Sequence, residues 1–128
     1  VFEHFYFRQL LTNVVVAGQN VRFDLAFIMA TFKRLGIEPP DGLDRHLYDL
    51  STLALEHLKP WLNSVSLPQI AKALGVKVEE SRLHNSLYDV ELTMKCAAIL
   101  QRAGWLKRLW WSYIVPRRLA ARPKKGTF

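Results

Sequence analysis

Residues 14–24 read VVVAGQNVRFD, a short strand pattern followed by a turn and the first residues of a helix. The β-branched run Val14–Ala17 is apolar on both faces, which is typical of a strand buried inside an α/β sheet. From Phe23 apolar residues recur every three or four positions as far as Leu35, so we expect an amphipathic helix there. Asp24 falls just beyond the carboxyl end of the strand, where open α/β sheets place their ligands.

Further elements are expected on both sides of this stretch. Residues 1–10 have helical spacing, residues 45–50 resemble a second strand, and three later helices are expected over residues 52–58, 67–74 and about 85–100. In the last helix we expect one stripe to face the core: Leu87, Val90, Met94, Ala97 and Ala98. This order is that of an α/β layered domain. Only two strands are recognisable, and a strand apolar on both faces needs neighbours for its backbone groups, so we expect part of the sheet to be missing from this chain.

Composition excludes several classes of protein. A chain of 128 residues that is 50% hydrophobic is long enough for one domain and too apolar to be disordered. No apolar run approaches the ~20 residues of a membrane-spanning helix, and no signal-peptide pattern is present, so we expect a cytoplasmic protein. The single cysteine, Cys96, excludes an internal disulfide framework and a multi-cysteine zinc site.

The positive charge lies at the C-terminal end of the chain. Residues 1–91 carry nine basic and eleven acidic residues, a net charge of −2, whereas residues 92–128 carry nine basic residues and no acidic one. The basic residues of the segment 104–128 are interleaved with aromatic ones, a pattern that suits single-stranded nucleic acid. It also suits an interfacial membrane helix. A third interpretation, which we favour, is that the tryptophans pack back on the domain and the last dozen residues are a solvated tail.

Three polar residues interrupt otherwise apolar or turn-forming segments: Asp24, His84 and Asp89. His84 and Asp89 lie five positions apart, which is 140° beyond a full helical turn, so they converge only if His84 precedes the helix and Asp89 lies in its first turns. The cap-forming residues Asn85 and Ser86 place the helix start between them. Taken singly, each has an ordinary explanation: a helix-dipole partner for Asp24, a solvated loop imidazole for His84 and a capping box for Asp89.

In combination, these segments resemble the DEDDh branch of the 3′-to-5′ exonucleases, which includes the epsilon proofreading subunit of bacterial DNA polymerase III and ribonuclease T. Residues 14–24 are similar to the second signature segment of that family and residues 84–89 to the third. Residues 48–54 and 66–75 are similar to the stretches between them. The resemblance covers residues 1–103 as a partial exonuclease domain, implies a ribonuclease H-like α/β fold, and leaves residues 104–128 as a basic, aromatic extension.

The resemblance implies a role for each candidate residue. Asp24 and Asp89 would bind Mg²⁺ or Mn²⁺, of which the complete domain holds two ions, and His84 would be the general base that activates the attacking water. Carboxylates are suitable ligands for these hard cations, and an imidazole can accept a proton near neutral pH. Asn20 would contact the terminal nucleotide. Phe23 is a second substrate-side candidate, although Phe23 and Tyr88 are better interpreted as packing residues.

The first signature segment of the family, an Asp-x-Glu pair on the opening strand, is absent from the sequence. Glu3 has Val1 two residues before it and lies in a helix pattern. Smaller departures are Gln19, where many members carry histidine, and Ser86 in place of alanine. We therefore expect a 3′-to-5′ exonuclease fragment that lacks N-terminal strands and is inactive as an isolated chain. The alternatives are a noncatalytic nucleic-acid-binding or interaction module and a peripheral membrane protein; the choice of DNA or RNA, polymerase association and oligomeric state stay open.

Overall fold

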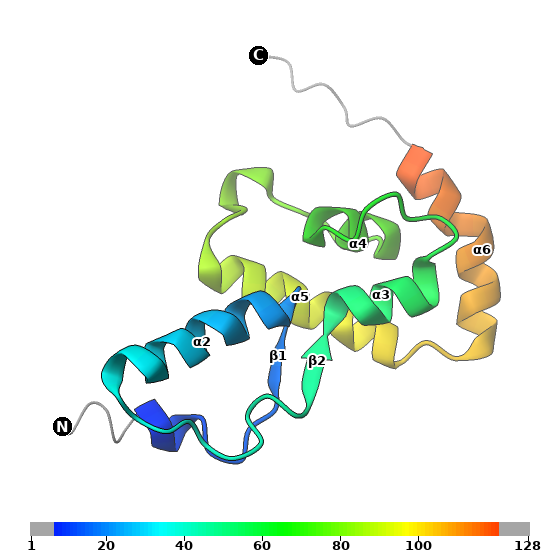
Figure 1. Cartoon of the computed structure of the whole chain (residues 1–128). Helices are drawn as coiled ribbons and strands as arrows, with labels where there is room; N and C mark the ends of the chain where they lie inside the picture. The colour runs from blue at the N-terminus through cyan, green and yellow to red at the C-terminus, as the bar shows by residue number, and fades with distance from the viewer. Residues whose placement is uncertain (1–6, 121–128) are drawn as a thin grey trace. The chain divides into compact units, whose positions relative to one another are not determined.

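The computed structural model describes residues 7–120, with the backbone alone at Trp105, and divides the chain into two compact units. The first is Val1–Asp49 and the second is Leu50–Phe128, and each is described by itself. Figure 1 shows the order of the elements along the chain. The chain is mixed α/β and mainly helical, which agrees with the expected class.

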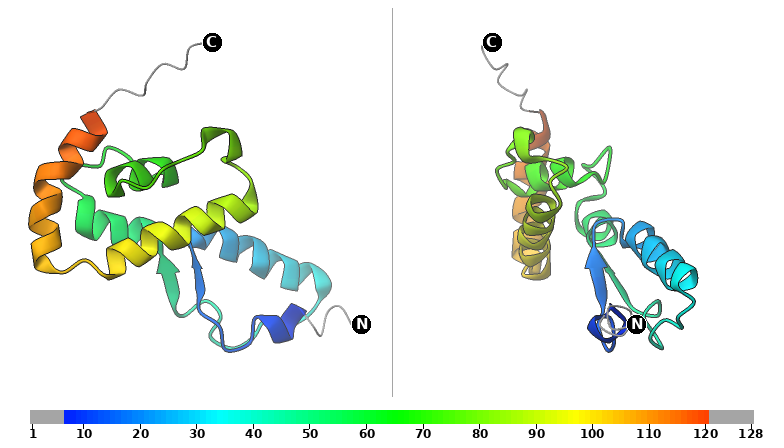
Figure 2. Two further views of the ribbon diagram at one scale, coloured as in Figure 1. Left: turned by 180° about the vertical axis from the view of Figure 1, so that it is seen from behind. Right: turned by 90° about the vertical axis from the view of Figure 1, so that its left-hand side faces the viewer.

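The first unit is a single strand-helix-strand crossover. Strand β1 (Val16–Gly18) and strand β2 (Leu47–Asp49) run parallel, with Val16 opposite Leu47 and Gly18 opposite Asp49. Helix α2 (Val21–Leu35) connects them, as parallel strands require. Both views of Figure 2 show the two strands side by side. The predicted second strand is confirmed, although it is three residues long and Leu50 already begins the next helix.

The predicted position of the first strand needs a correction. Val14 and Val15, expected inside a buried strand, precede β1 and are exposed. Pairing extends only as far as the partner strand does, and β2 has three residues, so the ladder ends at Val16. Over residues 7–120 the sheet consists of this pair of strands. The ribonuclease H-like fold, which needs further strands, therefore stays a prediction.

Helix α2 confirms the predicted amphipathic helix, with a start two residues earlier than expected. It ends at Gly36, which adopts a left-handed conformation (φ 66°) and donates its backbone N–H to the last turn. Its inner face places Leu25 and Phe32 in a small core with Leu43. Residues 7–10 are helical, and the rest of the helix predicted over residues 1–10 lies outside the described residues.

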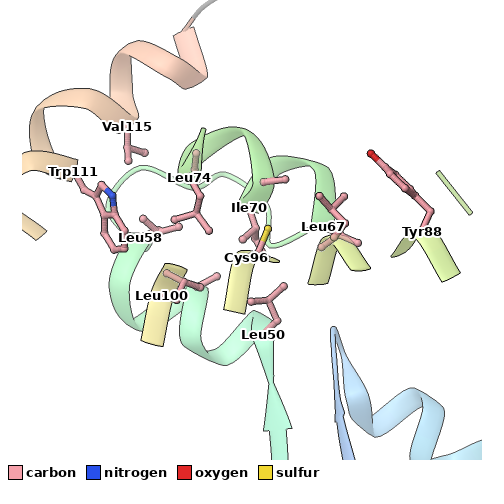
Figure 3. Packing of buried hydrophobic residues seen from close by; sticks show 14 residues of the cluster. Leu50, Leu58, Leu67, Ile70, Leu74, Tyr88, Cys96, Leu100, Trp111 and Val115 are labelled. Carbon is pink, nitrogen blue, oxygen red and sulfur yellow. The ribbon is translucent and has the colours of Figure 1, made fainter. Parts of the chain in front are cut away.

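The second unit is built from helices. They are α3 (Leu50–Leu58), α4 (Leu67–Leu74), α5 (Ser86–Gln101) and α6 (Trp105–Ala120), with a short 3₁₀ turn at Glu80–Arg82. Helix α4 packs on α5 and α6, and α3 packs on α5. Their common core, drawn in Figure 3, takes leucines from α3 and α4, Cys96 and Leu100 from α5, and Trp111 and Val115 from α6. The expected helices over residues 52–58, 67–74 and 85–100 are thus confirmed.

The predicted core face of α5 is wrong for its large residues, although Ala97 is partly buried against the core. Leu87, Val90 and Met94 are each more than half exposed, whereas the buried stripe steps by four residues through Tyr88, Leu92, Cys96 and Leu100. Helix α5 carries two apolar stripes, the predicted one and the buried one, and α3 and α4 pack on the buried stripe. Its sequence therefore could not indicate which face the neighbouring helices would cover.

Within the described part of the chain, no helix is both long and apolar enough to cross a membrane. The prediction that the tryptophans of the extension pack on the domain holds for Trp111, which is buried, and fails for Trp110, which is exposed. The last dozen residues were predicted to be a solvated tail. This is wrong for residues 117–120, which belong to α6, and residues 121–128 lie outside the described residues. The limit of the resemblance at residue 103 stays a prediction.

Candidate active site

The first group of candidate residues lies at the carboxyl end of β1. Asn20 follows the strand and adopts a left-handed conformation (φ 59°), which asparagine tolerates better than most residues. Its backbone N–H donates a 3.0 Å hydrogen bond to Oδ1 of Asp49, the last residue of β2. Because both strands are parallel, their carboxyl ends lie at the same edge, and this bond fixes the turn there.

Asp24 lies where its position in the sequence predicts. It is exposed in the first turn of α2, and its Oδ2 is 3.9 Å from the place that a Cβ on Gly18 would occupy. The carboxylate therefore reaches back over the end of β1 instead of pointing along the helix away from it. Asp24 and the carboxyl end of the strand form one local site, which is where α/β folds bind ligands.

Phe23 is not a packing residue. Its ring is 62% exposed and meets the equally exposed ring of Phe27 edge-to-face, with 5.0 Å between the centroids. The ring of Phe23 therefore does not pack in the core, contrary to its interpretation as a packing residue. The exposed aromatic pair next to Asp24 is compatible with the substrate-side role that the resemblance implies, and that role stays a prediction.

The second group lies at the start of α5, and its local geometry agrees with the prediction. His84 is in the loop before the helix, and Asn85 is the cap, with its Oδ1 accepting a 3.2 Å hydrogen bond from the N–H of Tyr88. Asp89 lies in the first turn, and its own N–H donates to the carbonyl of Asn85. The cap is thus Asn85 and not Ser86, so a capping box between Ser86 and Asp89 does not explain Asp89.

Tyr88 holds the loop that carries His84. Its side chain is buried, as expected for a packing residue, and its hydroxyl accepts a 2.7 Å hydrogen bond from the backbone N–H of Glu79. The guanidinium of Arg82 lies 4.6 Å from the centre of the same ring. The loop is therefore attached through Glu79, just before the 3₁₀ turn, and through Arg82, its last residue. His84 is exposed and adopts a left-handed conformation (φ 70°), which is unusual for a residue other than glycine.

Asp89 has one carboxylate oxygen that is buried and unpaired. Oδ1 has no hydrogen-bond donor within the part of the chain that the structure describes. A buried carboxylate oxygen without a donor is costly, because it has lost water and gained nothing in return. A cation next to Oδ1 would offset that cost. The donor chemistry of Asp89 therefore fits a divalent ion, although within residues 7–120 no group of three or more His, Cys, Asp and Glu side chains is placed to hold one.

The structure thus forms two local sites. Asn20, Phe23 and Asp24 belong to the first unit, and His84 and Asp89 belong to the second. Asp49 was not singled out from the sequence, yet it closes the end of β2 and fixes Asn20. An acidic residue at the end of a short strand was the signal that could have indicated it.

Comparison with known proteins relates both sites to one family. Residues 6–97 match the RNase T family of exonucleases, which is more than half of the chain and includes all five candidate residues. The chain belongs to this exonuclease family. The predicted resemblance is therefore confirmed, and α6 lies beyond the matched segment.

Curated relatives of this exonuclease-family chain are bacterial polymerases. It is 33% identical over 87 residues to a PolC-type DNA polymerase III of Pediococcus pentosaceus, covering 68% of this chain and 6% of that polymerase. It is 33% identical over 82 residues to the PolC-type DNA polymerase III of Mycoplasma genitalium, covering 64% of this chain and 5% of the relative. The chain thus spans a small part of the length of these relatives. No solved structure matches it.

Proposed function

We propose that this chain is part of a 3′-to-5′ exonuclease domain of ribonuclease H-like fold that hydrolyses phosphodiester bonds of DNA or RNA. The observation that carries the proposal is the buried, unpaired Oδ1 of Asp89 at a helix start that also presents His84, in a chain of the exonuclease family. By the relationship to the PolC-type polymerases, we also propose association with a polymerase and a cytoplasmic location.

In this proposal the carboxylates of Asp24 and Asp89 hold Mg²⁺ or Mn²⁺. When bound, such ions stabilise the charge that develops on the phosphate oxygens and on the leaving 3′ oxygen. His84 accepts a proton from the attacking water, and its exposed position in the loop leaves the imidazole accessible to that water. Asn20 and the exposed ring of Phe23 contact the terminal nucleotide.

A second candidate function rests on the sequence itself, in which the Asp-x-Glu pair of the family is absent. A site with Asp24 and Asp89 as its only carboxylate ligands would bind Mg²⁺ weakly, since this ion gives up water reluctantly. Such a chain would be a noncatalytic nucleic-acid-binding or interaction module derived from the exonuclease fold. For the same reason we expect the chain as given to leave 3′ ends intact.

The two functions are separated by supplying the absent motif. The chain is compared with a fusion that carries an N-terminal apolar strand segment with Asp-x-Glu, using 3′-labelled single-stranded DNA and RNA with Mg²⁺ or Mn²⁺. An exonuclease domain gives 3′-end hydrolysis in the fusion that Asp89→Asn abolishes and Asp44→Asn, an exposed loop control, does not. Hydrolysis by the unfused chain that Asp24→Ala abolishes would contradict the expected inactivity and would show that another residue completes the site.

A further inference from the structure

Helix α6 is attached to the second unit by one face. Trp111 and Val115 are buried in the core, on the side that Figure 3 shows. Nη1 of Arg118 donates a 3.2 Å hydrogen bond to the carbonyl of Ala73 near the end of α4. The guanidinium lies so close to Gly75 that a Cβ there would be 2.7 Å from it. These contacts fix the orientation of α6 on the second unit, so its opposite face points away from the core. Helix α6 lies outside the segment that matches the exonuclease family.

That opposite face is apolar and aromatic. Four large side chains at helical spacing are exposed by between 55% and 65%: Leu106, Leu109, Trp110 and Tyr113. The rings of Trp110 and Tyr113 are 6.2 Å apart and inclined by 36°. We call these four residues together with Arg117 the α6 outer face.

Arg117 adds a fixed positive charge to the α6 outer face. Its guanidinium lies 3.5 Å from the centre of the Tyr113 ring, and Nη1 donates a 2.7 Å hydrogen bond to the carbonyl of Tyr113. Pro116, the residue before Arg117, has no amide hydrogen, so the helix lacks the backbone hydrogen bond to the carbonyl of Ser112. Trp110, Tyr113 and Arg117 thus form a row of two rings and one planar cation.

The segment of sequence that contains the α6 outer face is cationic. Residues 92–128 carry nine basic residues and no acidic one. Among them, Arg108 is 3.9 Å from Glu56 and Arg118 is bonded to Ala73, whereas Arg102 and Lys107 are exposed. The charge therefore complements a polyanion, and the aromatic rings supply flat surfaces beside it.

We propose that the α6 outer face binds single-stranded nucleic acid without sequence preference, by base stacking on Trp110 and by phosphate contacts from Arg117, which the Tyr113 ring holds in place, and from Lys107, which is exposed on the same helix. Single-strand-binding surfaces combine these same two elements, rings for bases and cations for the backbone. An anionic bilayer is the competing partner. The geometry favours nucleic acid, because the Arg117 guanidinium lies on the face of the Tyr113 ring, within the surface that would have to enter the apolar layer.

The experiment measures binding of a fluorescein-labelled oligo(dT) 20-mer and an oligo(rU) 20-mer to the full chain in EDTA over a salt series. Without divalent ions the result does not depend on the proposed nuclease activity. Trp110→Ala should weaken binding about 5- to 150-fold, the range of one stacked base, whereas the control Leu10→Ala, also exposed, should not. Tyr113→Ala should also weaken binding, because it removes the ring on which Arg117 lies. Arg117→Gln should reduce the magnitude of the log-log salt slope by about 0.7, and Lys33→Gln, which removes the same charge from α2, should not.

Equal affinities of the parent chain and the Trp110→Ala and Tyr113→Ala variants would overturn the proposal, provided that their thermal unfolding is unchanged. A second outcome would also overturn it. In that outcome, vesicles of phosphatidylcholine and phosphatidylserine bind the parent chain but not the Trp110→Ala variant, whereas the oligonucleotides bind both proteins equally. That second outcome would assign the α6 outer face to a membrane surface. Failure of nuclease activity in the fusion described above would leave this binding result unaffected.

Discussion

The backbone N–H of Asn20 and the carboxylate of Asp49 are joined by a 3.0 Å hydrogen bond that connects the turn after β1 to the end of β2. The two residues are 29 positions apart, so the bond closes the whole strand-helix-strand crossover at the edge where Asp24 lies. The local site of the first unit therefore depends on a residue whose own role is structural.

Removing this bond should loosen the first unit. Asp49→Ala should lower the free energy of unfolding by about 1–2 kcal/mol, because it removes the charged acceptor of this solvent-exposed hydrogen bond. Asp49→Asn should lower it less, because Oδ1 remains an acceptor. Urea denaturation measures the loss, and faster hydrogen exchange at the Asn20 amide locates it. Asp44→Ala is the control, and an equal effect of Asp44→Ala and Asp49→Ala would contradict the assignment.

Two glycines offer a matched test of how α6 is attached. Gly36 and Gly75 both have positive φ, but a Cβ at Gly36 meets nothing within 4 Å, whereas one at Gly75 meets the Arg118 guanidinium. Gly36→Ala should cost about 1 kcal/mol from backbone strain alone. Gly75→Ala should cost about 1 kcal/mol more, because Arg118 must give up its bond to Ala73.

The double variant Gly75→Ala with Arg118→Ala separates the two causes. With the guanidinium already absent, alanine at position 75 should add only the backbone strain. A thermodynamic cycle from thermal or urea unfolding gives the coupling between Gly75 and Arg118. A coupling near zero would show that Arg118 moves away freely and that it does not fix α6.

The unpaired carboxylate oxygen of Asp89 predicts opposite effects on stability and on metal binding. Without metal, Asp89→Asn should raise the free energy of unfolding, because removing the charge from a buried, unpaired oxygen relieves more desolvation than the helix-dipole interaction of roughly 0.3–1 kcal/mol that is lost. With Mn²⁺ added, the variant should lose the stabilisation that the parent gains. Thermal unfolding with and without Mn²⁺ measures both, and Asp44→Asn should change neither. A less stable Asp89→Asn variant would indicate that Oδ1 has a partner.

His84 should affect turnover and not metal affinity. In the fusion that carries Asp-x-Glu, His84→Ala should lower the rate about 10²- to 10⁴-fold, the usual loss for a general base, while Mn²⁺ binding stays within about a factor of two. An unchanged rate and pH profile over pH 6–9 would refute the assigned role.

Cys96 should be chemically inert until the chain unfolds. Burial raises the pKa of its thiol to about 11, so at pH 8 almost none of it is the reactive thiolate. Reaction with a disulfide reagent at pH 8 should therefore be slow and should accelerate sharply in urea. Rapid reaction of the native chain would show that α5 separates from α3 and α4 on the timescale of the assay.

Local signals predicted most of the helices and the layout of both sites. Asn85 marked the start of α5, Gly36 marked the end of α2, and the spacing of His84 and Asp89 required the loop-then-helix arrangement that the structure has. These features depend on residues close in the chain, where backbone chemistry decides the outcome.

Features that depend on distant neighbours could not be predicted. Both stripes of α5 are apolar, so only the positions of α3 and α4 determine that Cys96 and not Met94 is buried. Trp110 and Trp111 are adjacent and chemically identical, and the direction from which α4 approaches decides which of them packs. The extent of β1 likewise depends on the length of its partner.

One edge of β1 has no strand beside it over residues 7–120, and the exposed residues Val14 and Val15 lead directly into it. Such an edge offers free N–H and C=O groups to any other extended chain, and this one has no lysine or proline to discourage self-association. The first unit therefore has the features of an aggregation template. Each measurement described above should be made at more than one protein concentration, and a gatekeeper substitution such as Val15→Lys would keep the sample monodisperse without touching either candidate site.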